Sequence, residues 1–286
     1  MALSLQIAAV SRQLRRPPGA FVDRMPERMP VVIAVLNSKG GVGKTTVAVN
    51  LAAALASPKR RVLLVDLDSH ASASLWLAVP RDHLRPSAGS CLLEKYPILK
   101  AIRHTGAPNL DVLPGSIELA NADVALCSVR GRETMLRRML ERLTSHYDLI
   151  VLDCPPGLSL LNVNAIVASD GLIVPVSPEP LAVEALDMLL AAVERVRARM
   201  TVRGRLVGIL LSAVDPQRKH GLEIAERLRA AHREKVFHTE IRVSAALSAA
   251  SAARKTIADA APKSPSADAF RRLAGEVLQR LPALRQ

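Results

Sequence analysis

The stretch Ser38-Lys39-Gly40-Gly41-Val42-Gly43-Lys44-Thr45 decides how this chain folds. It follows the apolar run Val31–Leu36, which predicts a buried strand, and it leads into Thr45–Ala56, which predicts a helix. A glycine-rich turn between a strand and a helix, ending in Gly-Lys-Thr, is the pattern of a phosphate-binding loop. The glycine that usually begins this pattern is replaced here by Ser38. The sequence therefore predicts a phosphate site where the first strand ends.

The residue types of this loop suit contact with phosphate oxygens. Glycines allow the backbone N–H groups to approach a ligand closely, and the helix N-terminus adds the positive end of its dipole. Lys44 is predicted to neutralise charge on the β- and γ-phosphates, and the Thr45 hydroxyl is predicted to bind Mg²⁺. The predicted nucleotide-binding residues are Lys39, Gly40, Gly41, Val42, Gly43, Lys44, Thr45 and Thr46.

The rest of the chain alternates between strand-like and helix-like segments. Further apolar runs occupy Arg61–Leu67, Leu110–Leu113, Leu149–Leu152, Leu172–Val176 and Val207–Leu211. Helix-like stretches occupy Arg132–Leu143, Leu181–Met200, Leu222–Ala231 and Ala267–Leu281. Continuous apolar strands separated by amphipathic helices are typical of a parallel sheet covered on both faces. The predicted fold is a single α/β domain over residues 31–286, with a mostly parallel, twisted sheet.

Composition excludes several classes of protein. The 286 residues are 49% hydrophobic, which is too apolar for a disordered chain. No apolar run approaches the roughly 20 residues of a membrane helix. The chain has three cysteines and no CxxC pair, so it has neither a disulfide framework nor a zinc or iron–sulfur spacing. A reduced, cytoplasmic protein is the expectation.

Positive charge is concentrated in the last third of the chain. The net charge is +13, and residues 195–286 hold 19 Lys and Arg against 8 Asp and Glu. This basic third indicates a polyanionic partner. Duplex DNA is expected over single strands, because 2% aromatic residues provide few stacking platforms. The alternative is an ordinary solvated surface in an arginine-rich protein.

Residues 1–30 are predicted to be a flexible, basic N-terminal extension. Arg12, Arg15 and Arg16 follow a short apolar stretch, which is the reverse of the order in a secretory signal. Met25 and Met29 both precede the first strand, so a start codon assigned too early is the alternative interpretation.

Three motifs together resemble the ParA/MinD ATPases. Lys39 gives the loop the form KGGVGKTT, which is similar to the family's deviant Walker A motif. The segment Val65–Ser74 resembles the ParA stretch VDLDPQGNAS, and Tyr147–Pro156 resembles the Walker B segment YDYILIDCPP. The similarity covers roughly residues 30–282 and is greatest with the chromosomal, Soj-like ParA proteins. It implies a P-loop NTPase-like fold.

The resemblance also implies a role for each matched residue. Lys39 would reach the partner's ATP phosphates across a dimer interface, and Asp68 would position the attacking water. The expected catalytic residues are therefore Lys39, Lys44 and Asp68, and the expected Mg²⁺ site consists of Thr45, Asp66 and Asp153.

Two residues in these motifs are not assigned to catalysis. Ser69-His70 replaces the Pro-Gln of ParA proteins, which leaves the geometry of this loop open, and His70 is interpreted as a loop residue. Cys154 has no obvious histidine partner in the sequence and is interpreted as a buried structural thiol.

The function implied by the resemblance is a weak, Mg²⁺-dependent ATPase that acts as a switch. The ATP-bound sandwich homodimer would bind duplex DNA non-specifically, and hydrolysis stimulated by a ParB-like centromere-binding protein or a cargo adaptor would release the monomer. Such a protein would serve chromosome or plasmid partition, or cargo positioning, in the cytoplasm on the nucleoid. The candidate DNA contacts are Arg218, Lys219, Arg227, Arg242, Arg254 and Lys255.

Other members of this lineage supply the alternatives. A MinD-type membrane switch would need a C-terminal amphipathic membrane helix. The last predicted helix is amphipathic, but it aligns with the final core helix of the family. An iron–sulfur ATPase is disfavoured by the cysteine spacing. A tyrosine kinase would carry a tyrosine-rich tail, whereas this chain has two tyrosines, Tyr96 and Tyr147.

Overall fold

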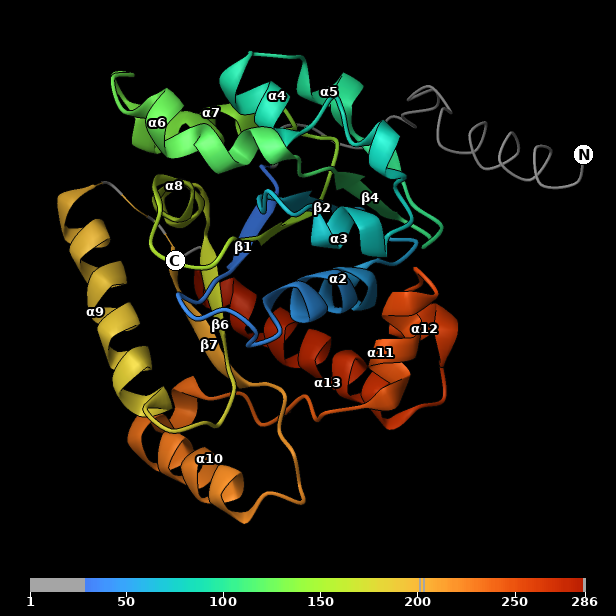
Figure 1. The fold of residues 1–286 in the computed structure, drawn as a ribbon, viewed down its shortest axis with the longest axis vertical. Helices are drawn as coiled ribbons and strands as arrows, with labels where there is room; N and C mark the ends of the chain where they lie inside the picture. The colour runs from blue at the N-terminus through green and yellow to red at the C-terminus, as the bar shows by residue number, and fades with distance from the viewer. Residues whose placement is uncertain (1–28, 201, 203, 285–286) are drawn as a thin grey trace, which may run out of the picture.

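The computed structural model describes residues 29–284 except 201 and 203. Within them, one seven-stranded sheet has the order β3-β4-β2-β5-β1-β6-β7 (Figure 1). Neighbouring strands are parallel except β3, which pairs antiparallel with β4 at one edge. The strands are β1 Val31–Val35, β2 Val62–Asp66, β3 Arg103–His104, β4 Leu110–Leu113, β5 Leu149–Asp153, β6 Gly171–Val176 and β7 Arg205–Leu211. The predicted mostly parallel α/β fold is confirmed.

Helices cover both faces of the sheet (Figure 1). On one face lie α4 Ala88–Leu93, α6 Ala122–Leu126, α7 Met135–Glu141, α8 Leu160–Ala168, α9 Ala182–Arg199 and α10 Lys219–His232. On the other lie α2 Lys44–Leu55, α3 Ser72–Trp76, α11 Ala245–Ala252, α12 Ile257–Ala260 and α13 Pro265–Arg280. The short α5 Ile98–Ala101 precedes the edge strand β3.

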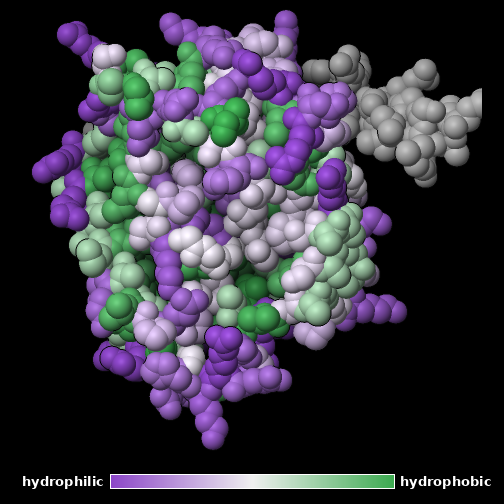
Figure 2. All heavy atoms as spheres, viewed as in Figure 1, coloured by the Kyte–Doolittle hydropathy of each residue, from purple (hydrophilic) through white to green (hydrophobic). Residues whose placement is uncertain are grey.

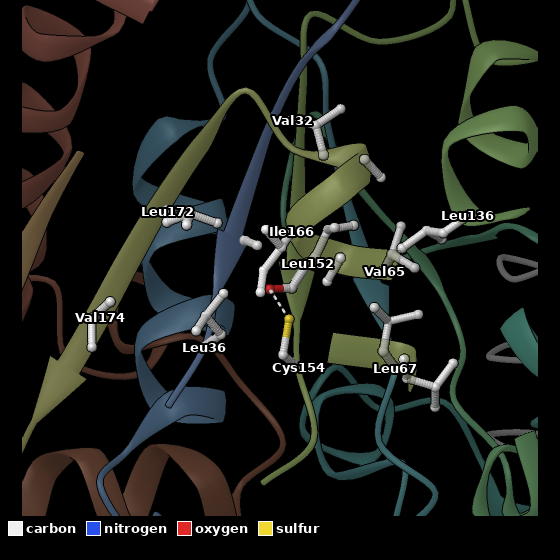
Figure 3. Close-up of a cluster of buried hydrophobic side chains, with 14 of the residues drawn as sticks. Val32, Leu36, Val65, Leu67, Leu136, Leu152, Cys154, Ile166, Leu172 and Val174 are labelled. Atoms are coloured by element: carbon white, nitrogen blue, oxygen red, sulfur yellow. Dashed lines mark hydrogen bonds between the residues drawn. The ribbon is translucent and has the colours of Figure 1, made fainter. Parts of the chain in front are cut away.

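Each face of the sheet has its own apolar core. In β1, Val32 and Ala34 belong to one buried cluster, whereas Ile33 and Val35 belong to the other. Figure 3 shows part of the first cluster, in which Cys154 lies among aliphatic side chains. Because side chains of a strand alternate between faces, a strand covered on both sides must be apolar throughout. This explains the continuous apolar runs of the sequence.

One local prediction was wrong in detail, and one short strand was missed. The stretch 132–143 is not one helix: a 3-10 turn, Arg132–Thr134, precedes α7, which ends at Glu141. The two-residue edge strand β3 was not predicted, because so short a segment carries no periodicity. The basic extension predicted for residues 1–30 lies almost wholly outside the described residues, so that division of the chain stays a prediction.

The last described α-helix belongs to the core. Ser264 caps the N-terminus of α13, and Pro265 occupies its first turn. Phe270, Leu273 and Val277 on its apolar face are buried, and the helix lies against α2. This apolar face is therefore not available to a membrane surface in this conformation. Among the described helices, none is long and apolar enough to cross a bilayer.

Candidate nucleotide-binding site

The loop between β1 and α2 has an open inner side. Gly41 and Gly43 have φ angles of +75° and +83°, a left-handed region that favours glycine. The loop is stabilised by a hydrogen bond that the Ser212 Oγ donates to the Val42 carbonyl over 2.7 Å. A Cβ atom added at Gly40 or Gly41 would meet nothing within 4 Å. A ligand can therefore approach this backbone closely.

The N-terminus of α2 is left free of side-chain caps. Gly43 precedes the helix, no side chain caps it, and its first turn contains no acidic residue. The first N–H groups of a helix have no intrahelical partner, and they carry the positive end of the helix dipole. A cavity of about 610 Å³ lies over this end of the helix, lined by loop residues including Lys44 and Thr45 and by Asp68. This arrangement suits an anion such as phosphate.

A larger cavity lies away from this loop. It measures about 830 Å³ and lies between residues 238–246 and α13. No residue of the phosphate-loop motif lines it, so we place the functional site at the smaller cavity.

Lys44 points inward beneath the loop. Its side chain is buried, and its ammonium group donates a hydrogen bond to the Lys39 carbonyl over 2.8 Å. Burial lowers the pKa of Lys44, whereas the nearby Asp153 and Asp68 carboxylates act in the opposite direction. The ammonium group is thus held beneath the loop, close to the side chains of Asp153 and Asp68.

Asp153 at the end of β5 is a buried carboxylate without a hydrogen-bond partner. Both of its oxygens are unpaired within the described part of the chain, and the residue is 0% exposed. Burial raises the pKa of Asp153 well above its ordinary value, and so does Asp66, while the Thr45 hydroxyl and Lys44 lower it. An unpaired buried carboxylate is costly unless a cation is bound to it. Asp153 and Thr45 therefore fit a Mg²⁺ site.

The protein alone would not complete such a metal site. Among the described residues, no group of three or more His, Cys, Asp or Glu side chains is placed to hold a metal ion. Mg²⁺ is commonly bound by one or two carboxylates together with substrate phosphates and water. The donor set fits a metal ion that arrives with a nucleotide.

Asp66 lies opposite Asp153 in the register of β2 and β5, and it holds the segment that follows β2. Its Oδ2 accepts hydrogen bonds from the Ser74 N–H (2.9 Å) and hydroxyl (2.6 Å). Its Oδ1 accepts one from the Asp68 N–H over 3.1 Å. Burial raises the pKa of Asp66 to about 6 despite these bonds. Asp66 therefore anchors α3 and the Asp68 segment, and its predicted role toward Mg²⁺ stays a prediction.

Asp68 lies at the wall of the cavity and is held by His70. The Oδ1 of Asp68 accepts a hydrogen bond from the His70 N–H over 2.9 Å and lies 2.8 Å from the His70 Nδ1. The imidazole itself is exposed to solvent. His70 is thus a loop residue, as interpreted, and it is also the direct partner of the carboxylate expected to position water.

The structure directs Lys39 away from the cavity of its own chain. Its ammonium group forms an ion pair with Glu179 in the segment after β6, and Lys39 does not line the cavity. The hydrogen bond from Lys39 lowers the pKa of Glu179. The structure thus groups Gly40, Gly41, Gly43, Lys44, Thr45, Thr46 and Asp68 around the cavity, with Lys39 outside it.

Two residues of this site had no signal in the sequence. Glu179 contacts Lys39, and Ser212 contacts the Val42 carbonyl, each from a distant position in the chain. Ser74, which contacts Asp66, belongs to the segment that resembles ParA proteins. Cys154 is buried beside Asp153, which together with burial raises the pKa of its thiol. Its Sγ lies 3.9 Å from the Leu152 carbonyl (Figure 3), so the interpretation as a buried thiol is confirmed.

Comparison with known proteins agrees with this site. A family model described as an AAA domain matches residues 30–205. The chromosome-partitioning ATPase Soj of Thermus thermophilus is 43% identical over 249 residues, which cover 87% of this chain and 96% of that protein. This chain belongs to the ParA/Soj family of P-loop ATPases. The sporulation initiation inhibitor protein Soj of Bacillus subtilis is 38% identical over 87% of this chain and 98% of its own length.

A solved structure shares the fold of this chain. The Mycobacterium smegmatis protein described as cobyrinic acid a,c-diamide synthase, with bound ADP and magnesium, superimposes on this ParA/Soj protein with a TM-score of 0.77. It is 31% identical, and the match covers 89% of this chain and 96% of that one. A neighbour with the same fold thus holds a nucleotide and a magnesium ion.

The predicted DNA contacts of this ParA/Soj protein are all exposed, but they lie in different places. Arg218, Lys219 and Arg227 lie at the start of α10 or on it. Arg242 precedes α11 and pairs with Glu240 over 2.9 Å. Arg254 and Lys255 follow α11, and Arg254 lines the nucleotide cavity. Their role in DNA binding stays a prediction.

Proposed function

We propose that this ParA/Soj protein is an ATP-driven switch for chromosome or plasmid partition, or for positioning another cargo. It binds ATP and Mg²⁺, forms a homodimer around the nucleotide, and binds duplex DNA without sequence preference. A ParB-like protein or cargo adaptor stimulates hydrolysis and returns the protein to the monomer. Asp153 is the observation that carries this proposal, because its unpaired buried oxygens lie beside Thr45 and Lys44. The chromosome-partitioning relatives support the biological setting.

The phosphate site supports the proposal of a slow ATPase. Mg²⁺, when bound, neutralises charge on the phosphates. Lys44 and the N–H groups at the start of α2 bind the phosphate oxygens, and Asp68 orients a water molecule. In the structure the Asp68 Oδ1 is engaged by His70, so part of its capacity to accept hydrogen bonds is already used. Slow hydrolysis keeps the ATP-bound state long enough for the switch to act.

Lys39 supports the dimer. In the single chain, its charge is neutralised by Glu179 in an exposed ion pair. Exposed pairs contribute little free energy, of the order of 0–1 kcal/mol, so the pair can be exchanged for a stronger one. Two triphosphates between subunits concentrate negative charge, and additional cations are needed to offset it. Lys39 can leave Glu179 and bind the partner's phosphates.

The basic C-terminal third supports DNA binding. Figure 2 shows hydrophilic side chains gathered over α10, where Arg218, Lys219 and Arg227 lie. Each phosphate contact releases counterions, so the contacts of two subunits add up in a dimer. The dimer should therefore bind far more tightly than the monomer, and salt should weaken its binding steeply. DNA binding then places the protein on the nucleoid.

Binding to random-sequence duplex DNA near physiological salt tests this function. The protein is titrated with Mg²⁺ and ATP, with Mg²⁺ and ADP, and without nucleotide, alongside Lys39→Ala. We expect binding at least about tenfold tighter with ATP than with ADP, and loss of that difference in Lys39→Ala. Equal DNA affinity in all three states would mean that the basic third acts independently of the nucleotide, and the proposal would fail.

A further inference from the structure

The turn that follows α11 carries a residue in an unusual conformation. Arg254 has a φ angle of +54°, in the left-handed region that favours glycine. The turn is closed by hydrogen bonds from the Arg254 N–H to the Ser251 carbonyl and from the Lys255 N–H to the Ala250 carbonyl, both 3.0 Å. Arg254 therefore carries a long side chain in a backbone conformation that favours glycine.

This turn is fastened to both helices that border the nucleotide cavity. The Trp76 Nε1 of α3 donates a hydrogen bond to the Lys255 carbonyl over 2.8 Å. The Asn50 Oδ1 of α2 accepts one from the Ile257 N–H, also over 2.8 Å. Because α2 begins at the phosphate loop and α3 is anchored to Asp66 through Ser74, the position of Arg254 is fixed relative to the phosphate site.

Arg254 lines the nucleotide cavity, together with Ser251 and Trp76. Lys44, Thr45 and Asp68 line the same cavity. Thr45 and Asp68 mark the end where the terminal phosphate and its attacking water would lie. The surface around the turn is alanine-rich, shown in pale green over α11 and α12 in Figure 2. Arg254 is therefore set apart from the basic side chains of α10.

The other cations near this site are already engaged. Lys44 donates to the Lys39 carbonyl, and Lys39 pairs with Glu179. Arg254 forms no ion pair with any carboxylate in the part of the chain that the structure describes. Its guanidinium group carries a rigid fork of donors that matches phosphate oxygens in a bidentate manner.

We propose that Arg254 binds the terminal phosphate of ATP held in its own chain and makes the site prefer ATP to ADP. This inference rests on the ATP binding proposed above and assigns one of the six predicted DNA contacts to the nucleotide site. A cation placed there also stabilises negative charge on the phosphoryl group as it is transferred. Arg254 therefore contributes to ATP affinity and to hydrolysis.

The substitution Arg254→Gly gives a sharp test, because the backbone at this position favours glycine. It removes the side chain and its charge without straining the turn, so the melting temperature should stay the same or rise. Arg254→Lys keeps the charge but loses the bidentate fork. Lys263→Ala removes an exposed cation of the same C-terminal segment that does not line the cavity, and it serves as the matched control.

Affinities for fluorescently labelled ATP and ADP are measured with Mg²⁺, together with single-turnover hydrolysis. For Arg254→Gly we expect an affinity for ATP reduced about tenfold, an affinity for ADP changed less than about threefold, and slower hydrolysis. Arg254→Lys should be intermediate, and Lys263→Ala should match the wild type. An unchanged ATP-to-ADP preference in Arg254→Gly would overturn the inference, including the case in which only DNA affinity falls.

Measurements on the wild type distinguish a failure of the proposed function from a failure of the inference on Arg254. If it binds no ATP, the proposed function fails. If it binds ATP and Arg254→Gly does so with the same preference over ADP, the proposed function stands and this inference is wrong.

Discussion

The acidic site of this protein (Asp66 and Asp153) is buried, whereas the charges of its basic third (residues 195–286) lie mainly at the surface. Asp66 and Asp153 lie at the carboxyl edge of the sheet, fully buried, with raised pKa values. Arg218 and Arg227, in contrast, lie on the exposed surface of α10 or at its start. A buried charge is so costly that its position requires a reason, whereas an exposed arginine is tolerated almost anywhere. The buried carboxylates therefore indicate which residues would bind the metal, whereas the exposed arginines indicate only that the partner is a polyanion.

The largest expected effect comes from the acidic site. Asp153→Asn keeps the size of the side chain and removes the charge that would bind Mg²⁺. We expect Mg²⁺-dependent ATP hydrolysis to fall about a hundredfold or more, because the asparagine no longer supplies the negative charge that would hold Mg²⁺ at the phosphates. Steady-state phosphate release measures the effect. Near wild-type turnover would show that the unpaired oxygens of Asp153 have no part in binding the metal.

The same substitution should change how stability depends on pH. Burial and Asp66 raise the pKa of Asp153, so the folded protein holds this proton more tightly than the unfolded chain, whose ordinary value is about 3.9. The contribution of Asp153 to stability is therefore lost as the pH rises above about 4 toward the folded pKa. Without Mg²⁺, Asp153→Asn should therefore exceed the wild type in free energy of unfolding at pH 7.

Urea unfolding of both proteins at several pH values between 4 and 8 checks this expectation. The difference between the two free energies should grow with pH. A difference that stays constant over the range would contradict the account of a buried, ionisable Asp153.

A smaller effect is expected at the ion pair between the phosphate loop and the segment after β6. Glu179→Gln removes the ion pair that holds Lys39 in the single chain. Because exposed pairs are weak, the ATP-dependent dimer should form at a protein concentration lower by at most about fivefold. Glu184→Gln, an exposed glutamate in the first turn of α9, is the matched control. Weaker dimerisation in Glu179→Gln would show that Glu179 supports the dimer.

The smallest effect is expected in the basic third. Arg227→Ala removes one exposed arginine of α10. DNA affinity should fall by less than about threefold at physiological salt, and the slope of log affinity against log salt should become shallower by about one. Fluorescence anisotropy at several salt concentrations measures both. An unchanged slope would remove Arg227 from the set of phosphate contacts.

The contrast between the two regions also explains what the sequence could predict. The fold and the phosphate loop were predictable, because continuous strands and the glycines at 41 and 43 are local signals. The partners Glu179 and Ser212 lie 140 and 170 residues from Lys39 and Val42, and no local spacing indicates such contacts. Arg254 is predicted as a DNA contact from its charge and from the family resemblance, and only the packing of α11 against the nucleotide site places it in the cavity.

The central claim is that ATP joins two chains through Lys39, and sedimentation velocity with Mg²⁺ tests it most directly. Asp68→Ala is used to slow hydrolysis, and it is compared with the double variant Lys39→Ala/Asp68→Ala in ATP, in ADP and without nucleotide. The account predicts a dimer of Asp68→Ala in ATP alone and a monomer of the double variant in every state. A monomer of Asp68→Ala in ATP, or the same dimer in all three states, would contradict it.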